Sequence, residues 1–319
     1  MRTFLKYAII IALVPAMLFT SCKKENEETF NAQEVLADYL VEQNLDINTI
    51  IGGFVLAPAD ESEVSNFYII DIRSASDYET GRIAGSHRVD FANLLTEAAL
   101  ADKPILVVCK TGQTATYAVA LLRLSGYADA KALKWGMSAW NSNFDVWTSS
   151  ISNIAEGHNN WTTSAAPTNL TYSSPEFTSN STDPAEILRQ RVAAVFAEGF
   201  KTATADDVLN TPANYFINNY FSEADYLGYG HINGAYRINP LLVGEGQVNF
   251  LDPSKKIATY CYTGQTSAAI TAYLRVLGYD AVSVTFGMNR LYNSNTAWAT
   301  SPNRWNATMA RSFPYVTGK

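Results

Sequence analysis

Histidine and cysteine are both scarce in this sequence of 319 residues, with only three of each. Their positions in the chain lie far apart, and none has the short spacing of a zinc-binding motif. We therefore predict no metal site and no cofactor. Cys-x-x-Cys, the usual motif of a thiol redox protein, does not occur either, so a dithiol oxidoreductase is disfavoured.

Positive charge is also in short supply. Lysine and arginine number 23 against 30 aspartates and glutamates, which gives a formal net charge of −7. Loss of an N-terminal segment carrying Arg2 and Lys6 would lower this charge to −9. An acidic chain lacks the basic footprint of nucleic-acid-binding proteins, and it binds anionic lipid surfaces poorly. We therefore expect no nucleic-acid partner.

The apolar run at residues 7–19 is too short to span a bilayer comfortably. It follows a basic start and precedes small residues, a pattern typical of a secretory signal, which we place at residues 1–21. Cys22 comes next and resembles a bacterial lipoprotein processing site, with residues 22–30 as a tether. We expect an exported protein that is lipid-anchored in the bacterial cell envelope, at the outer membrane, and touches the membrane only through this anchor. An ordinary cleaved signal with an unmodified Cys22 is the alternative.

The other two cysteines lie in nearly identical loops that are 152 residues apart. Glycines, aromatic residues and a Gly-Met pair around these loops recur at offsets of 148 to 152 residues. A constant offset of this size indicates a duplicated domain of ordinary length. The two loops are Cys109-Lys110-Thr111-Gly112-Gln113-Thr114 and Cys261-Tyr262-Thr263-Gly264-Gln265-Thr266.

Strand-like and helix-like patterns alternate in both halves, which predicts an α/β fold with two similar domains, each a central parallel sheet flanked by helices. We predict domain 1 at residues 31–150, a Ser/Thr/Asn/Pro-rich linker at 151–182 and domain 2 at 183–319. Within the linker, Trp161 is expected to dock on a domain. Expected strands are 67–72, 105–108, 257–260 and 281–284, and expected helices are 31–45, 114–124, 183–198 and 266–277.

Each repeated loop places its cysteine between a strand and the N-terminus of a helix. Free backbone N–H groups and the helix dipole at this point stabilise a thiolate and can hold an anion against the sulfur. Thr114 and Thr266 are candidates to cap the helices or to donate a hydroxyl, and Lys110 adds a cation that Tyr262 does not supply. The plainer interpretation is that each cysteine is a small buried hydrophobic residue. It explains poorly why the motif recurs intact.

These loops and their surroundings resemble the rhodanese (sulfurtransferase) family. In the first half the resemblance runs in family order over almost the whole domain, and in the second half it covers the Tyr226 and Gly230–Ala235 region, the Cys261 loop and residues 286–288. The matching first-half pieces are Ile70-Asp71-Ile72-Arg73, Tyr78 with Gly81-Arg82-Ile83-Ala84-Gly85-Ser86, the Cys109 loop, Gly126-Tyr127 and Trp135-Gly136-Met137-Ser138-Ala139-Trp140.

The resemblance implies an enzyme that takes a sulfane sulfur from a donor such as thiosulfate and passes it to a thiol or cyanide through a cysteine persulfide. It implies that Cys109 and Cys261 are the nucleophiles. It also implies that residues 110–114 and 262–266 bind the small sulfur-containing anion, and that Asp71 and Arg73 form a structural pair near the site. The second half has Asn219 and Phe221 in place of that pair, so we expect domain 2 to be the weaker or more specialised catalyst.

Three other functions compete with this hypothesis. Phosphatases and arsenate reductases use a similar loop but need an arginine six places after the cysteine, where this chain has Ala115 and Ser267. A thiol redox protein is disfavoured by the missing Cys-x-x-Cys. A non-catalytic sulfur carrier or binding module of the envelope would look the same in sequence and stays open. His87 and His231 are interpreted as turn residues, since the loop itself is expected to ionise the thiol.

Overall fold

The structure is a computed structural model, and it describes residues 30–318. The predicted signal peptide, the Cys22 lipidation site and nearly all of the predicted tether therefore lie outside the described residues. From Asn31 onward the chain forms one compact unit. None of the helices found between residues 30 and 318 has the length and apolar character needed to cross a membrane.

The first half is built on a five-stranded sheet with all neighbouring strands parallel, in the order β1-β5-β4-β2-β3. Strand β4 lies at its centre and is buried along its whole length, as expected for a parallel sheet covered on both faces. The strands are β1 (Val55–Leu56), β2 (Tyr68–Asp71), β3 (His87–Arg88), β4 (Ile105–Val108) and β5 (Lys131–Leu133).

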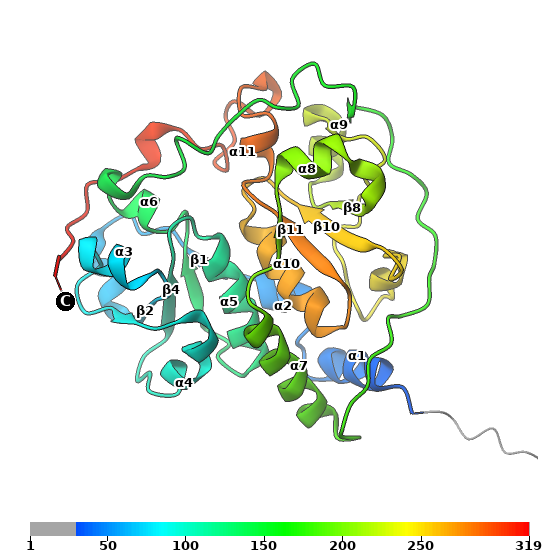
Figure 1. The fold of residues 1–319 in the computed structure, drawn as a ribbon, viewed down its shortest axis with the longest axis horizontal. Coiled ribbons are helices and arrows are strands. Elements are labelled where there is room, and N and C mark those ends of the chain that lie inside the picture. The colour runs from blue at the N-terminus through cyan, green and yellow to red at the C-terminus, as the bar shows by residue number, and fades with distance from the viewer. Residues whose placement is uncertain (1–29, 319) are drawn as a thin grey trace, which may run out of the picture. The chain divides into compact units, whose positions relative to one another are not determined.

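The second half repeats this arrangement in a parallel sheet of order β7-β11-β10-β8. A parallel bridge from Asn218 to Tyr236 stands where β3 stands in the first sheet. The predicted α/β class with parallel sheets is thus confirmed, and Figure 1 shows helices beside both sheets. The strands are β7 (Thr202–Ala203), β8 (Tyr215–Asn219), β10 (Lys256–Tyr260) and β11 (Ala281–Val284).

Two helices, one from each half, pack against each other at the centre of the molecule (Figure 1). They are α5 (Gln113–Leu124) and α10 (Gln265–Val276), the helices that follow the cysteine loops. Both are buried on nearly all sides, because each covers its own sheet and packs on the other helix. Their short polar residues Thr116, Ser267 and Thr271 are also buried.

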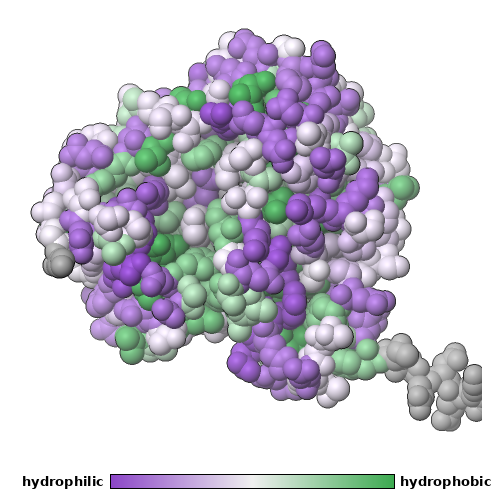
Figure 2. Space-filling model, viewed as in Figure 1, coloured by the Kyte–Doolittle hydropathy of each residue, from purple (hydrophilic) through white to green (hydrophobic). Residues whose placement is uncertain are grey.

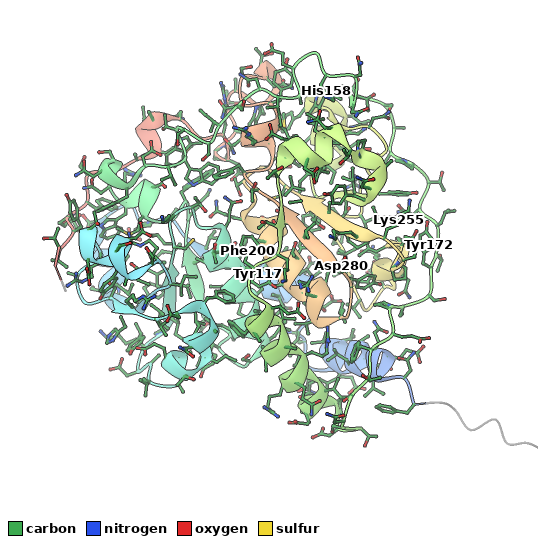
Figure 3. The ribbon with its side chains drawn as sticks, in the orientation of Figure 1. Tyr117, His158, Tyr172, Phe200, Lys255 and Asp280 are labelled. Carbon is green, nitrogen blue, oxygen red and sulfur yellow. The ribbon has the colours of Figure 1, made fainter. Side chains whose placement is uncertain are left out.

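Some of the remaining helices contact both halves, whereas others pack mainly on one half. Helix α7 (Pro184–Glu198) contacts both central helices and also α1 (Ala32–Glu42). Just after α7, Phe200 packs against Tyr117 of α5, with ring centroids 4.9 Å apart, as Figure 3 shows. The other helices are α2 (Ile47–Ile51), α3 (Ala75–Thr80), α4 (Leu94–Ala98), α6 (Met137–Trp140), α8 (Ala205–Asn210), α9 (Glu223–Tyr229) and α11 (Met288–Leu291).

The helix predicted at residues 31–45 is present but ends three residues early. Helix α1 ends at Glu42, and Asn44 takes a left-handed φ of 54°, which a continuous helix cannot contain. Helix α2 then starts at Ile47, capped by Asp46. The Asp46 carboxylate also accepts hydrogen bonds from the backbone of Val243 and Gly244 in the second half, at 3.1 and 3.0 Å.

The segments that follow each sheet cross to the opposite half. Strand β6 (Trp161–Thr162), after the first sheet, pairs antiparallel with β9 (His231–Ile232) of the second half, which confirms the predicted docking of Trp161. The C-terminal segment does the reverse, since Val316 bridges to Arg82 of the first half. These two crossing segments tie the halves into one unit. The boundaries given above for domain 1, the linker and domain 2 stay predictions.

The surface in the view of Figure 2 is mixed, with hydrophobic residues in scattered patches among polar ones. Isolated apolar residues at a surface are normal and mark no interface by themselves. The chemistry of the molecule therefore has to be sought at the loops that end its central strands.

Candidate active site

Both cysteines of the repeat lie at the carboxyl end of the central strand of a sheet, where parallel α/β folds usually bind ligands. Cys109 follows β4 and is 5% exposed, and Cys261 follows β10 and is 1% exposed. Gly112 and Gly264 precede the next helices with φ values of 83° and 76°, a left-handed conformation that favours glycine. The repeat therefore builds the same turn twice.

Cys109 lies inside a curl of backbone N–H groups. Gly112 and Ala115 donate hydrogen bonds to its Sγ at 3.1 and 3.3 Å. Burial raises the pKa of the Cys109 thiol above its ordinary range and outweighs the lowering by the N–H groups of Ala115, Thr111 and Gly112. The expectation that the loop alone ionises this thiol is therefore wrong for the closed site, because desolvation of the thiolate is the larger effect.

Cys261 has a different set of partners. Its Sγ accepts one hydrogen bond, from the backbone of Ser267 at 3.3 Å, and its thiol contacts the Ser267 hydroxyl at 3.7 Å. That hydroxyl also bonds to Ser283, at 2.9 Å. The first half has Ala115 and Ala132 at the positions of Ser267 and Ser283, so the Cys109 sulfur has only backbone N–H donors. The Cys261 sulfur, in contrast, also contacts the first of two bonded serine hydroxyls.

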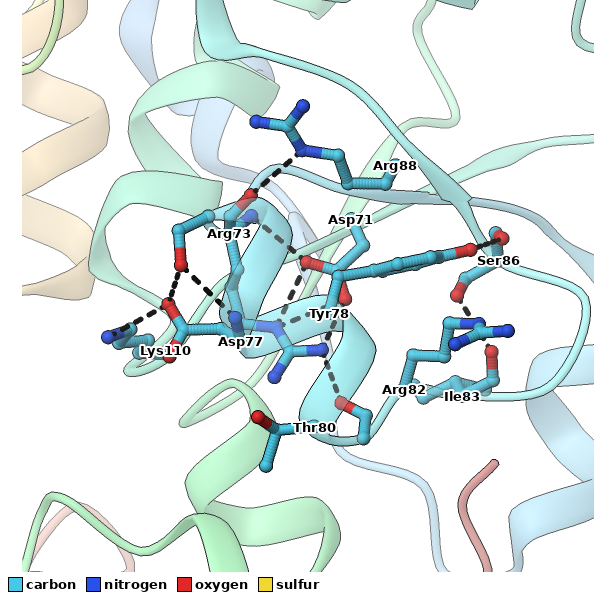
Figure 4. Close-up of polar contacts among 12 residues, drawn as sticks. Asp71, Arg73, Asp77, Tyr78, Thr80, Arg82, Ile83, Ser86, Arg88 and Lys110 are labelled. Atoms are coloured by element: carbon cyan, nitrogen blue, oxygen red, sulfur yellow. Dashed lines mark hydrogen bonds and ion pairs between the residues drawn. The ribbon is translucent and has the colours of Figure 1, made fainter. Parts of the chain in front are cut away.

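The residue after each cysteine reaches the same acidic position on a neighbouring helix. Lys110 forms an ion pair with Asp77 of α3, at 3.0 Å, as Figure 4 shows. Tyr262 donates its hydroxyl to Asp225 of α9, at 2.6 Å. Burial raises the pKa of Asp77, but hydrogen bonds from Ser74 and Lys110 outweigh it and hold that pKa below its usual range. The predicted cation beside Cys109 is thus present and anchored by a carboxylate.

Asp71 and Arg73 form a buried ion pair at the end of β2, with 2.6 Å between the guanidinium and the carboxylate (Figure 4). Arg73 also donates to the carbonyl of Gly81 at 2.7 Å, so the pair fixes the turn after α3. In the second half Asn219 bonds to the backbone of Phe221, whose ring stacks on Tyr262 with centroids 4.5 Å apart. An aromatic stack thus replaces the ion pair.

A second segment packs closely on each cysteine loop. Met137 donates its N–H to the carbonyl of Cys109 at 2.9 Å, and Met288 does the same to Cys261 at 3.1 Å. A side-chain carbon on the preceding residue, Gly136, would lie 2.3 Å from the Cys109 carbonyl oxygen, so only glycine fits there. The repeated Gly-Met pair of the sequence is explained by this contact.

The residues before those glycines, Trp135 and Phe286, have left-handed backbones with φ of 65° and 61°. Their N–H groups are bound across the molecule. Gln265 of the second cysteine loop accepts from Trp135 at 3.1 Å, and Gln113 of the first loop accepts from Phe286 at 2.9 Å. We call these two contacts the reciprocal glutamine bonds. Each loop therefore contacts the segment that covers the other loop.

Threonine hydroxyls stabilise the start of both helices, but not the predicted ones. Thr111 accepts from the backbone of Gln113 at 3.4 Å, and Thr263 accepts from Gln265 at 3.2 Å. The expected capping by Thr114 and Thr266 is wrong, because each is the second residue of its helix and so lies among the free N–H groups instead of before them. Of the ten predicted anion-binding residues, six lie in the two loops and four in the first turns of α5 and α10, and their role in binding stays a prediction.

An aromatic cluster covers the first loop. Trp147 is completely buried and donates its indole N–H to the carbonyl of Thr111 at 3.1 Å. It packs edge-on against Trp135 and stacks with Trp305, at ring-centroid distances of 4.7 and 5.6 Å. Sequence reasoning missed Trp147 and also Asp77. The second was detectable, since Asp77-Tyr78 and Asp225-Tyr226 share the offset of the repeat.

The interpretation of His87 and His231 as turn residues is wrong, since they begin the short strands β3 and β9. Each histidine has contacts of its own. His87 stacks on Tyr68 at 4.5 Å, and His231 is buried against Tyr226 at 3.5 Å with its pKa lowered by burial. His158, labelled in Figure 3, contacts Asn210 at 3.2 Å. Within residues 30–318 no group of three or more His, Cys, Asp or Glu side chains is placed to hold a metal ion.

Part of this chain is similar in sequence to known proteins. Thiosulfate sulfurtransferase GlpE of Pseudomonas fluorescens (strain SBW25) is 32% identical over 84 residues, covering 26% of this chain and 77% of that protein. GlpE of Pseudomonas aeruginosa (strain LESB58) is 33% identical over 85 residues, covering 26% and 76%. A solved thiosulfate sulfurtransferase from Pseudomonas aeruginosa aligns with 88% of this chain and 49% of its own at 16% identity, with a TM-score of 0.28.

Two regions of the chain, residues 55–143 and 219–292, match the rhodanese-like domain family and together make up just over half of its length. Each region contains one cysteine loop and the acidic residue that contacts it. The chain therefore belongs to the rhodanese-like domain family, with one such domain in each half.

Proposed function

We propose that the protein is a sulfurtransferase that moves a sulfane sulfur from a thiosulfate-like donor to a thiol or cyanide, with Cys109 as its main nucleophile. The observation that carries this proposal is the pair of backbone N–H groups, from Gly112 and Ala115, that point at Cys109 Sγ. Such groups stabilise negative charge on the sulfur that attacks and on the sulfur that it receives.

The proposed step begins when the Cys109 thiol loses its proton to water. The thiolate attacks the outer sulfur of thiosulfate, an S–S bond forms to the cysteine, and the S–S bond of the donor breaks to release sulfite. A second nucleophile, a thiolate or cyanide, then attacks the outer sulfur of the persulfide and regenerates the Cys109 thiolate. No net oxidation occurs, so this sequence needs neither a metal nor an additional redox cofactor.

The surroundings of Cys109 suit an anionic donor. Backbone N–H groups at a helix N-terminus bind oxyanions, and Lys110 adds a cation at the mouth of the same loop. Cys261 has one backbone donor and no cation beside it. We therefore propose that Cys109 turns over small anionic donors and that Cys261 is the weaker or more specialised site.

The test is intact-mass spectrometry of residues 23–319 after exposure to thiosulfate, followed by peptide mapping. The proposal predicts that one sulfur atom is gained on Cys109 and is lost again on addition of cyanide. If neither cysteine gains sulfur from thiosulfate, polysulfide or 3-mercaptopyruvate, the proposal fails and a non-catalytic binding module becomes the better account.

We also propose that the chain is exported and anchored to the bacterial cell envelope through a lipid on Cys22, at the outer membrane. The support is the basic start, short apolar run and small residues before this cysteine. Metabolic labelling with a radioactive fatty acid in a bacterial host tests it. Labelling should occur in the native chain and vanish in Cys22→Ser. Equal labelling of the two would contradict the anchor, whatever the outcome for sulfur transfer.

A further inference from the structure

We infer that Gln265 and Gln113 are positioning residues that act across the duplication, each holding closed the cover of the cysteine in the other half. The inference rests on the geometry of the reciprocal glutamine bonds and does not require sulfur transfer. Gln265 belongs to the Cys261 loop in sequence, but its side-chain oxygen accepts from Trp135, which covers the Cys109 loop.

The contact is close on both sides. A side-chain carbon built on Gly112 would lie 2.6 Å from the oxygen of Gln265, and one built on Gly264 would lie 2.2 Å from that of Gln113. Only glycine at these two positions lets the glutamines reach across. Thr116 strengthens the same junction by donating its hydroxyl to the Gln265 carbonyl, at 2.9 Å. The two loops are thus fitted to each other as well as to their own cysteines.

The N–H groups of Trp135 and Phe286 donate to no backbone carbonyl, and the glutamine oxygens are their acceptors. Trp135 and Phe286 have left-handed backbones, which cost free energy for a non-glycine residue and persist only when contacts hold them. Removing the glutamine oxygen leaves the N–H group without its acceptor, in a buried position at Trp135 and a part-buried one at Phe286. The cover of one site should therefore open more often when the loop of the other site is altered.

The test compares Gln265→Met with Gln113→Met in the full mature chain, using mapped alkylation of both cysteines by iodoacetamide. We expect Gln265→Met to speed alkylation of Cys109 roughly tenfold relative to Cys261, which corresponds to about 1.4 kcal/mol, and Gln113→Met to give the opposite ratio. Gln265→Glu keeps an acceptor oxygen and should restore most of the native ratio. Equal acceleration of both cysteines, or no change in either, would overturn the inference.

A variant that fails to fold would be recognised by its circular dichroism. In that case Gln265→Asn, whose side chain is polar but one carbon shorter, replaces Gln265→Met. The same increase in the ratio of Cys109 to Cys261 alkylation is expected. If each variant accelerates alkylation only of the cysteine in the other half, the effect is one of positioning. A general loss of stability would expose both sulfurs together. The outcome does not depend on whether either sulfur accepts a sulfane sulfur.

A separate observation points to a binding site beside the aromatic cluster. We propose that a cavity of about 320 Å³ at the ends of β1 and β5 binds a small organic anion with an apolar body. This volume lies at the lower end of the range for small-molecule sites. Its walls include Trp135, Trp140 and Met309, two cations, Lys134 and Arg311, and no acidic side chain.

The cations are the reason for this choice of ligand. Lys134 Nζ lies 3.4 Å from the Asn303 side-chain oxygen and 5.4 Å from the centre of the Trp135 ring. Burial lowers the pKa of Lys134, and no acidic side chain lines the cavity to offset this desolvation. Among the described residues neither Lys134 nor Arg311 takes part in an ion pair. A carboxylate or sulfonate would supply the missing charge, and the aromatic walls would pack on its ring or chain.

The second half has no equivalent. Thr285 stands at the position of Lys134, and Arg290, which replaces Ala139, is neutralised by Asp206 at 3.0 Å. The unpaired cations are therefore particular to the half that contains Cys109.

The probe is benzenesulfonate, titrated by calorimetry against the mature chain, with benzenesulfonamide as its neutral analogue. We expect saturable binding of the anion, binding of the amide at least tenfold weaker, and roughly tenfold loss in Lys134→Met. Lys103→Met, an exposed lysine bonded to the Ser65 carbonyl, is the control and should bind normally. Cys109→Ser should also bind, which separates this site from sulfur transfer. Equal affinity for anion and amide, or no binding, would refute the proposal.

Discussion

The two cysteine sites of this molecule share a backbone but differ in charge. Around Cys109 lie an ion pair, Asp71 with Arg73, and a second one, Lys110 with Asp77. At the equivalent positions around Cys261, Phe221 stacks on Tyr262, and Tyr262 bonds to Asp225. The turn, the glycines and the covering segment are the same in both. The comparison teaches that the loop geometry can be kept while the electrostatics that suit an anionic donor are replaced.

The largest expected effect on activity comes from removing the Cys109 sulfur. Cys109→Ser should remove most of the thiosulfate:cyanide sulfur transfer, because serine cannot form a persulfide, whereas Cys261→Ser should keep most of the activity. Initial rates of thiocyanate formation at saturating thiosulfate measure this. Full activity in both single variants would break the comparison, since neither sulfur would then be needed.

The buried ion pair of the first half predicts the next largest effect. Arg73→Met leaves the Asp71 carboxylate buried without its partner, and the side chains of the pair are only 3% and 1% exposed. We expect the free energy of unfolding to fall by about 3–5 kcal/mol in urea titrations.

The second half supplies the matched control for this change. The double variant Asp71→Asn with Arg73→Phe copies Asn219 and Phe221 and leaves no unpaired charge. It should lose clearly less stability than Arg73→Met. A single variant that loses under ~1 kcal/mol would show that the Asp71 charge is compensated in another way.

A smaller effect should follow from exchanging the residues after the cysteines. Lys110→Tyr removes the cation at the mouth of the first site, so KM for thiosulfate should rise roughly fivefold at low salt. The increase should shrink at high ionic strength, where exposed charges are screened. Tyr262→Lys is the reverse exchange. A KM that does not respond to Lys110→Tyr at any salt concentration would remove this residue from donor binding.

The smallest effect concerns pH. Burial raises the pKa of Cys109 in the folded chain above its ordinary value of 9.0, so the folded state holds this proton more tightly than the unfolded state. Stability from this group is fully present below the ordinary thiol pKa and is lost as pH rises through and above it, by no more than about 1.4 kcal/mol per pH unit.

The measurement is urea unfolding of the native chain and Cys109→Ser from pH 7 upward. The native chain should lose more stability in the alkaline range than the serine variant does. Identical slopes for the two would mean that the thiol titrates with the same pKa in both states.

The elements around each cysteine could be predicted because their signals are local. Strand β11 and the two central helices begin and end within a residue of the stretches expected from apolar runs and glycines. The two loops were visible because they are repeated. The end of α1 was placed three residues late, since asparagine takes the left-handed conformation of Asn44 less regularly than glycine does.

The contacts between the halves could not be predicted, because they join residues far apart in the chain. The bond from Phe286 to Gln113 links positions separated by 173 residues, and Trp135 and Gln265 are separated by 130. The pKa of Cys109 was misjudged for a related reason. Dipole and N–H groups follow from the loop sequence, but burial depends on segments such as Trp147 that pack over the loop from elsewhere.

The measurement that tests the central difference most directly is a quenched time course of thiosulfate exposure, with peptide mapping of both cysteines in the same sample. Each molecule then serves as its own control for concentration, folding and pH. The structure predicts that persulfide appears on Cys109 first and reaches a higher level there than on Cys261. Equal rates at the two cysteines, or faster labelling of Cys261, would contradict the account.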